Sequence, residues 1–231
     1  MQISFAITSW QRTAMVLQCF EQILLDPRIG EIIISDDFSD LEVYQWLCKA
    51  TSGMDKVKLS RNSANLDCYQ NKRAAILKSS FDWCILADSD NIFGKDYIDK
   101  IFELQTWEQD TIYAPFHAKP QFDYSNYAGM TLTKENVAAI IDKPLLSTAL
   151  NTANYFVNRK FFLNVWDGGM NPVTADTLFH NYNHLAAGGK IKIVGGLSYY
   201  HLVHAGSHYK NNVHRTNGFD LYVEQQIREL K

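Results

Sequence analysis

The apolar residues in the first half of the chain follow two alternating patterns. Short continuous runs rich in isoleucine predict strands that are buried on both faces of a parallel sheet. Between them, apolar positions three and four residues apart predict helices. The predicted strands are 3–8, 31–35, 56–59 and 83–87, and the predicted helices are 12–25, 41–48, 69–78 and 97–105. This order favours a three-layer α/β fold with a mostly parallel sheet.

The pattern in the second half is less regular, with several polar and aromatic stretches. The predicted strands are 111–116, 154–158, 190–194 and 198–203, and the predicted helices are 134–141, 161–165, 176–187 and 219–230. The predicted loops are 117–128, 167–173 and 204–218. Because no linker or repeat interrupts the chain, we predict one domain over 1–231, with a nucleotide-binding half (1–110) and a substrate-binding half (111–231).

Composition narrows the class of protein. Hydrophobic residues make up 46% of the 231 residues, which can bury a core and excludes a disordered chain. The net charge of −3 argues against a protein that coats nucleic acid. No apolar run has the length of about 20 residues that spans a bilayer. The start of the chain lacks signal-peptide features, and the four cysteines lack zinc spacing, so we predict reduced thiols and a cytoplasmic location. Peripheral membrane association and the oligomeric state stay open.

Three polar clusters directly follow predicted strands. They are Thr8-Ser9-Trp10, Asp36-Asp37 and Asp88-Ser89-Asp90. A single acidic turn after a strand is commonly a helix cap, but ligands of parallel α/β sheets bind beyond the carboxyl ends of the strands. Two carboxylates two residues apart need a counter-charge, and oxygen ligands suit Mg²⁺ or Mn²⁺, which also bind substrate phosphates. We therefore predict a ligand site at this edge of the sheet.

Several common catalytic motifs are absent from the sequence. The first predicted strand is not followed by G-x-G-x-x-G, which argues against a dinucleotide dehydrogenase. Neither a P-loop nor a G-x-S-x-G elbow occurs, which argues against a P-loop nucleotidase and an α/β-hydrolase. A phosphatase with an aspartyl nucleophile would carry its D-x-D after the first strand, whereas here it follows the fourth.

The ordered set of motifs resembles family 2 glycosyltransferases. The segments that carry the resemblance are Ile7-Thr8-Ser9-Trp10, Asp36-Asp37-x-Ser39, Asn71-Lys72-Arg73-Ala74-Ala75 and Asp88-Ser89-Asp90-Asn91, the last at the D-x-D motif of the family. The resemblance covers residues 1–100 and continues more weakly through Asp176 and 201–208. It implies a GT-A fold, a nucleotide-sugar donor and a divalent Mn²⁺ or Mg²⁺ ion.

The resemblance also implies roles in donor binding. Thr8 and Asp37 would contact the nucleobase, and Asp37 would accept from a uracil-type N–H, which favours a UDP-linked donor. Lys72 stands where the family often has arginine, near the base or ribose, and Asp88 would lie near the ribose. This lysine leaves the base identity open, because the two cations are not interchangeable in planar recognition. The full predicted donor set is Thr8, Ser9, Trp10, Arg12, Asp36, Asp37, Asn65, Lys72, Asp88, Ser89 and Lys210.

The metal ligands follow from the same resemblance. Asp90 would bind the ion that bridges the diphosphate of the donor. The family returns a further ligand from a His-containing segment, which here is 201–208. We favour His204 as that ligand, with His201 and His208 as alternatives.

An inverting transfer needs a carboxylate that takes the proton of the acceptor hydroxyl. The family places it in an acidic pair that opens a helix of the second half. Here the corresponding stretch is 174–177, and the first acid of the pair is absent. Asp176 is therefore the predicted base, with Asp167 as the alternative. Lys210 and Arg215 either neutralise the diphosphate leaving group or lie on a solvated loop.

These observations predict a metal-dependent, inverting glycosyltransferase of the hexosyltransferase class, active in polysaccharide biosynthesis. Its acceptor would be a saccharide or a lipid-linked saccharide. Two alternatives stay open: a sugar-phosphate nucleotidyltransferase, although the expected glycine-rich loop after the first strand is missing, and a non-catalytic module that binds sugar nucleotides. Some aromatic residues of the second half could stack on acceptor sugars, but we expect most to lie in the core. They are Tyr124, Tyr127, Tyr155, Trp166, Tyr199 and Tyr200.

Overall fold

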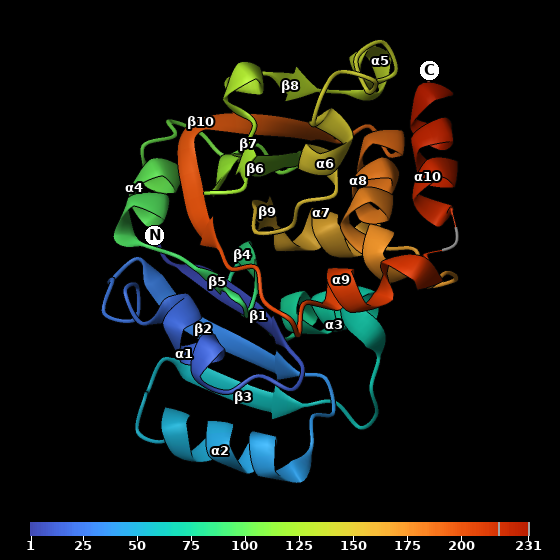
Figure 1. Ribbon diagram of the computed structural model, residues 1–231. Coiled ribbons are helices and arrows are strands. Elements are labelled where there is room, and N and C mark those ends of the chain that lie inside the picture. The colour runs from blue at the N-terminus through green and yellow to red at the C-terminus, as the bar shows by residue number, and fades with distance from the viewer. Residues whose placement is uncertain (217, 231) are drawn as a thin grey trace.

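The computed structural model describes residues 1–216 and 218–230, with only the backbone of His208 and Tyr209. Its centre is a ten-stranded sheet in the order β3-β2-β1-β4-β9-β6-β10-β5, with β7 beside β6 and β8 beside β10 (Figure 1). The strands are β1 Ile3–Ser9, β2 Ile29–Asp36, β3 Val57–Arg61, β4 Trp83–Asp88, β5 Asn91–Ile92, β6 Thr111–Lys119, β7 Phe122–Asp123, β8 Thr131–Leu132, β9 Phe156–Asn158 and β10 Lys190–His201.

Helices cover both faces of the sheet, which makes the three layers that the sequence predicts. The α-helices are α1 Ala14–Phe20, α2 Leu41–Thr51, α3 Asp67–Lys78, α4 Lys95–Phe102, α5 Lys134–Val137, α6 Leu146–Leu150, α7 Arg159–Asn164, α8 Asp176–Ala186, α9 His208–Asn212 and α10 Phe219–Arg228. The 3₁₀ turns are η1 Ser125–Tyr127, η2 Val173–Ala175 and η3 Val213–Arg215.

The first four long strands form a parallel block, β3-β2-β1-β4, as their continuous apolar runs predict. In this block the register pairs Thr8 with Asp88 and Ser9 with Asp36. The polar residues that follow β1, β2 and β4 therefore start at the same level of the sheet. The predicted helix 12–25 is shorter in the structure, since α1 ends at Phe20 and turns follow it.

Several predictions for the second half are wrong. The predicted loop 204–218 contains α9 and η3, and the predicted helix 134–141 ends at Val137. The predicted strands 190–194 and 198–203 are one strand, β10, whose register against β6 shifts between Val194 and Ser198. Gly196, at φ +85°, accommodates the irregularity within the strand. The predicted loop 117–128 contains the end of β6 and its antiparallel partner β7, because the polar and aromatic residues there pair at the sheet.

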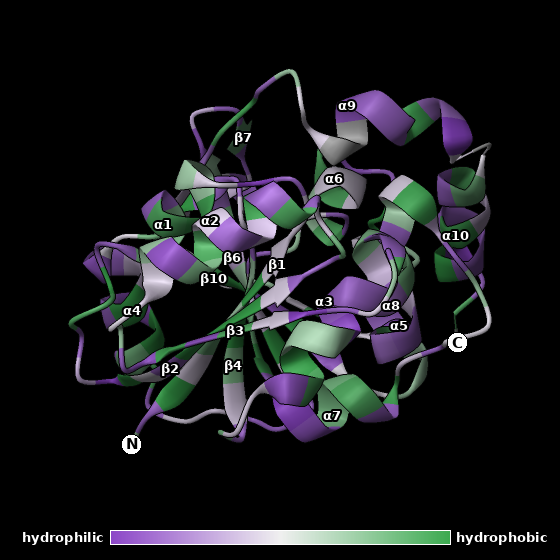
Figure 2. Ribbon diagram, turned by 90° about the horizontal axis from the view of Figure 1, so that it is seen from below, coloured by the Kyte–Doolittle hydropathy of each residue, from purple (hydrophilic) through white to green (hydrophobic). Residues whose placement is uncertain are grey.

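Two apolar clusters fill the interior, one on each face of the sheet. One lies beneath α1 and α4, and the other lies between the sheet and α3, α6, α7, α8 and α10. Figure 2 shows the apolar strands between the helices. Cys19 and Cys84 are buried as predicted. Among the described residues, no helix is long and apolar enough to cross a membrane.

Candidate active site

The three strand-end clusters meet at the carboxyl edge of the parallel block. The hydroxyl of Thr8 donates to Asp88 Oδ1 at 3.4 Å. The backbone N–H of Asp37 donates to the Ser9 carbonyl at 2.8 Å, and that of Ser89 donates to the Thr8 carbonyl at 3.2 Å. The convergence that the sequence predicts is therefore present.

Asp36, the first acid after β2, is fully buried within its own turn. Its carboxylate accepts from the Ser39 backbone N–H at 3.1 Å and from the Ser39 hydroxyl at 2.5 Å. Arg61 Nε lies 3.6 Å from Asp36 Oδ2. A carboxylate that is enclosed and paired in this way organises the turn, and we interpret Asp36 as a structural support of the site.

Asp37 is also buried, but it lies on the side of Asn62 and the loop that precedes α3. Its Oδ1 accepts from the Leu66 N–H at 2.8 Å and from Asn62 Nδ2 at 3.0 Å, while Asn65 Nδ2 donates to the Asp37 carbonyl at 3.2 Å. Burial raises the pKa of Asp37 despite these hydrogen bonds. Asn65, a predicted donor residue, therefore supports the turn that carries Asp37.

Asp88, at the end of β4, is held by a residue that the sequence did not single out. Asn154 Oδ1 accepts from the Asp88 backbone N–H at 2.9 Å, and Asn154 Nδ2 lies 3.5 Å from Asp88 Oδ2. Asn154 is buried at φ +69°, and its carbonyl accepts from the Tyr97 hydroxyl at 2.6 Å. An asparagine beside an apolar run was the available signal, since asparagine tolerates the left-handed region.

Asp90 lies beside His204 and Arg12. His204 Nε2 is 3.0 Å from Asp90 Oδ2, and Arg12 Nη2 is 3.7 Å from the same oxygen. Arg12 Nη2 also donates to the Gly206 carbonyl at 2.6 Å. His201 faces Asn91 instead, with its Nδ1 3.1 Å from Asn91 Oδ1. The side chain of the third alternative, His208, lies outside the described residues.

The Asp90–His204 pair can be tested as part of a metal site. Two neighbouring ligands in octahedral geometry, each at about 2.1 Å from the ion, stand about 3 Å apart, and the observed separation is 3.0 Å. The Gly206 N–H donates to His204 Nδ1 at 3.1 Å, so Nε2 carries the ring proton. A metal at Nε2 would replace that proton, and the hydrogen bond from the Gly206 N–H to His204 Nδ1 would have to break. With this change the pair fits an ion.

In the part of the chain that the structure describes, the site offers these two ligands. Among the described residues, no three His, Cys, Asp or Glu side chains are grouped to hold a metal. Divalent ions such as Mg²⁺ commonly bind through one or two carboxylates and complete their coordination with substrate phosphates and water. The pair is therefore of the kind that needs a phosphate-bearing ligand.

Asp176 begins α8 directly after η2 and is buried against α3. Its carboxylate accepts from Lys72 Nζ, which also lies 3.5 Å from Asp88 Oδ1. Burial lowers the pKa of Lys72, but Asp176 and Asp88 outweigh this effect and hold it well above the ordinary value. The alternative base, Asp167, is exposed, and its Oδ1 accepts from the Gly169 N–H at 2.8 Å in its own loop.

The remaining predicted residues differ in exposure. Trp10 is half exposed, Ser9 is buried, and Lys210 is exposed on α9. Arg215 Nη2 lies 4.0 Å from Asp67 Oδ2 at the start of α3. Most of the aromatic residues considered for the acceptor site belong to the core, as expected. These buried residues are Tyr124, Tyr127, Tyr155 and Tyr199.

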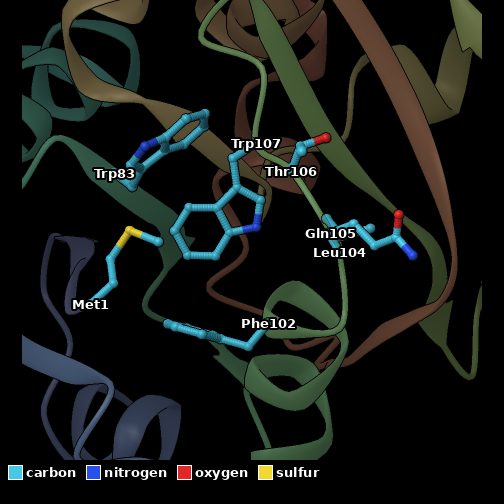
Figure 3. A pocket seen from close by; sticks show the side chains of 7 residues that line it. All are labelled: Met1, Trp83, Phe102, Leu104, Gln105, Thr106 and Trp107. Atoms are coloured by element: carbon cyan, nitrogen blue, oxygen red, sulfur yellow. The ribbon is translucent and has the colours of Figure 1, made fainter.

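A hollow of about 230 Å³ lies away from this cluster (Figure 3). It is lined by Met1, which precedes β1, and by Trp83, the first residue of β4. Phe102 and Trp107 face the same space. The hollow is therefore at the opposite edge of the sheet and contains none of the predicted site residues.

The family model "Glycosyl transferase family 2" matches residues 4–165. The chain belongs to glycosyl transferase family 2. This confirms the class predicted from the strand-end motifs, and the chain is a glycosyltransferase by family. A search of curated proteins finds no match.

Solved structures show that this family 2 glycosyltransferase has the expected GT-A fold. S. aureus TarS 1-349 in complex with UDP-GlcNAc is 12% identical with a TM-score of 0.71, over 99% of this chain and 70% of that one. Mannosyltransferase PcManGT from Pyrobaculum calidifontis, in complex with GDP-Man and Mn²⁺, is 10% identical with a TM-score of 0.68, over 96% and 62%. A longer TarS structure is 10% identical with a TM-score of 0.65, and the whole chain spans 43% of its length.

Proposed function

We propose that this glycosyltransferase moves a sugar from a nucleoside diphosphate donor to a hydroxyl of a saccharide or lipid-linked saccharide, with inversion at the anomeric carbon. The observation that carries the proposal is the meeting of Asp88, Asp90 and Asp176 around one edge of the sheet. Asp88 and Asp176 share Lys72, and Asp90 lies beside His204. A donor-binding edge and a candidate base are thus adjacent.

The donor we propose is UDP-linked. The two structural neighbours carry UDP-GlcNAc and GDP-Man, so the likeness of fold leaves the base open. Asp37 favours uracil over cytosine, because a carboxylate oxygen accepts from the ring N–H that uracil presents and cytosine lacks. The family resemblance at this position favours uracil over guanine. Among the described residues, the hydrogen bonds to the side chain of Asp37 reach Oδ1, which leaves Oδ2 for a ligand.

Asp90 and His204 would hold a divalent ion, for which Mn²⁺ is the better choice of the two predicted. An imidazole nitrogen beside a carboxylate suits a transition-metal ion better than Mg²⁺, which prefers oxygen. When bound, such an ion supplies positive charge that stabilises the departing diphosphate. Lys210 is the exposed cation nearest in sequence to His204 and could add charge on the same side.

Asp176 is the proposed general base. It would take the proton of the acceptor hydroxyl while that oxygen bonds to the anomeric carbon and the bond to the diphosphate breaks. The nucleoside diphosphate leaves with the electron pair of that bond. The position at the start of α8 places Asp176 on a defined element, with Lys72 holding its carboxylate.

The experiment combines donor screening with one variant. UDP-, GDP- and CMP-linked sugars are incubated with Mn²⁺ or EDTA, nucleotide binding is measured by calorimetry, and product configuration is determined by NMR. We expect release of UDP, tightest binding of UDP, and an inverted product. Asp176→Asn should slow transfer by about 10²–10⁴-fold with unchanged UDP affinity.

Other outcomes would contradict individual parts of the proposal. Tighter binding of GDP would contradict the donor, and a retained configuration would remove the need for a base. If Asp167→Asn loses sugar transfer while Asp176→Asn keeps full activity, the general base is Asp167. Nucleotide binding without diphosphate release from any donor would favour the non-catalytic module.

A further inference from the structure

Lys72 occupies an unusual place for a lysine. It lies on α3, is 7% exposed, and directs its ammonium group towards the start of α8. The next residue, Arg73, is exposed on the same helix. Two adjacent cations on one helix thus differ completely in environment, and only Lys72 reaches the cluster of carboxylates.

The ammonium group of Lys72 has three polar neighbours. Nζ donates to Asp176 Oδ2, lies 3.4 Å from the Thr177 hydroxyl, and lies 3.5 Å from Asp88 Oδ1. Asp176 is as buried as Lys72, whereas a third of the Asp88 side chain is exposed. The ammonium therefore joins an enclosed carboxylate on α8 to a more accessible one at the end of β4.

The resemblance implies that Lys72 lies near the base or the ribose, and the observed contacts are not beside Asp37, the residue proposed to bind the base. A residue that reads the nucleobase would be expected to lie beside Asp37, but the side chains around Asp37 are Asn62 and the loop before α3. In the structure Lys72 faces Asp88 and Asp176 instead. Its buried charge is balanced within the protein, which leaves no need for a donor to pair with it.

We propose that Lys72 is a positioning residue for the transfer step, which holds Asp176 in a fixed position relative to Asp88. This inference rests on the proposed function, in which Asp176 is the base. A single ammonium that is hydrogen-bonded to Asp176 and lies 3.5 Å from Asp88 links the donor side of the site to the base. A misplacement of 1 Å in such an arrangement can cost about 10²-fold in rate.

The test uses Lys72→Met, which keeps most of the length of the unbranched side chain and removes its charge. We expect transfer to fall about 10²-fold in kcat, with UDP affinity within about threefold of the wild type. The matched control is Arg73→Met, which removes the neighbouring exposed cation and should leave both quantities unchanged. A loss of UDP affinity as large as the loss of kcat would overturn the proposal, because Lys72 would then bind the donor directly.

A double-mutant cycle separates positioning from a general structural role. If Lys72 acts through Asp176, then Lys72→Met should cost little further kcat in the Asp176→Asn background. Independent losses that multiply would overturn the inference. If Asp176→Asn alone retains full transfer, the assignment of the base fails; if it loses transfer while Lys72→Met does not, only the inference fails.

Removal of one partner from a buried ion pair can unfold a protein. Lys72→Arg, which keeps the charge, supplies the second variant, and thermal melting checks the fold of each protein. We expect Lys72→Arg to retain UDP affinity and to recover kcat to within about tenfold of the wild type, because its guanidinium also pairs with carboxylates. Transfer as low as in Lys72→Met, or lost UDP affinity, in a folded Lys72→Arg protein would overturn the proposal.

Discussion

Two acidic turns follow strands of the same parallel block, but they are held in different ways. The turn after β2 is stabilised within the first half of the chain, with Ser39 bonded to Asp36 and Asn62, 25 residues further on, bonded to Asp37. The turn after β4 is reached from the second half of the chain, where Asn154 bonds to Asp88. The turn after β2 is thus completed by the parallel block and the loop before α3, whereas the turn after β4 also needs a partner from the second half of the chain.

The difference between the two turns indicates which of them can carry the reaction. A turn whose carboxylates are satisfied by neighbouring residues is rigid and can present a contact for recognition. A turn whose partners come from distant elements brings several functional groups to one point, which a reaction requires. We therefore assign support and recognition to the turn after β2, and the reacting edge to the turn after β4.

The largest effect is expected at the turn after β4. Asp90→Ala should reduce transfer at least about 10³-fold, because a bound metal contributes several kcal/mol to stabilising the developing charge. EDTA should have the same effect on the wild type. Melting temperature and diphosphate release, measured with and without Mn²⁺, check both statements.

The control for Asp90→Ala is Asp82→Ala. Asp82 is an exposed carboxylate at the opposite end of the same strand, and its removal should leave transfer unchanged. Full activity of the wild type in EDTA would contradict the metal role. It would also contradict the assignment of the reacting edge to the turn after β4.

The second effect separates the two turns by stability. Asp36→Ala should lower the free energy of unfolding by about 1.5–3 kcal/mol, since the hydrogen bonds of a buried charged group are lost. Urea denaturation measures the change. Asp40→Ala is the matched control, because Asp40 is exposed in the same turn and makes no side-chain cap bond to α2. Equal stability of both variants would contradict the supporting role of Asp36.

The third and smallest effect concerns Asp37. Its replacement should not lower the stability, in contrast to the replacement of Asp36. Burial raises the pKa of Asp37 above its unfolded value, so its contribution is favourable below that value and is lost as the pH rises. At neutral pH, Asp37→Asn removes this penalty and keeps an acceptor for Leu66 and Asn62. The melting temperature at pH 7 should therefore stay equal or rise.

The same variant tests recognition. UDP affinity should fall about tenfold in calorimetry, the order expected when a hydrogen bond loses its charged acceptor. Because the penalty disappears at low pH, any gain in melting temperature should shrink as the pH approaches 4. A drop in melting temperature as large as that of Asp36→Ala would show that both acids of this turn are structural.

The sequence by itself determined the parallel block and the polar ends of its strands. These features are encoded locally: continuous apolar runs predict buried strands, and the residues that follow a parallel strand lie at one edge of the sheet. The family motifs lie in the same region, so the class of enzyme was predictable from it. The antiparallel pairs of β7 and β9 were not, because their short, partly polar segments pair only when β4 and β6 are in place.

Only the tertiary structure decided which side chains meet at the site. Lys72 and Asp176 are 104 positions apart, and no local pattern distinguishes Lys72 from the exposed Arg73 beside it. The packing of α3 against α8 buries one cation and leaves the other in solvent, and a buried ammonium needs a carboxylate to compensate its lost hydration. The role of Asn154 also depends on the tertiary structure. Its left-handed backbone and its bonds to Asp88 form only when the second half of the chain returns to the end of β4.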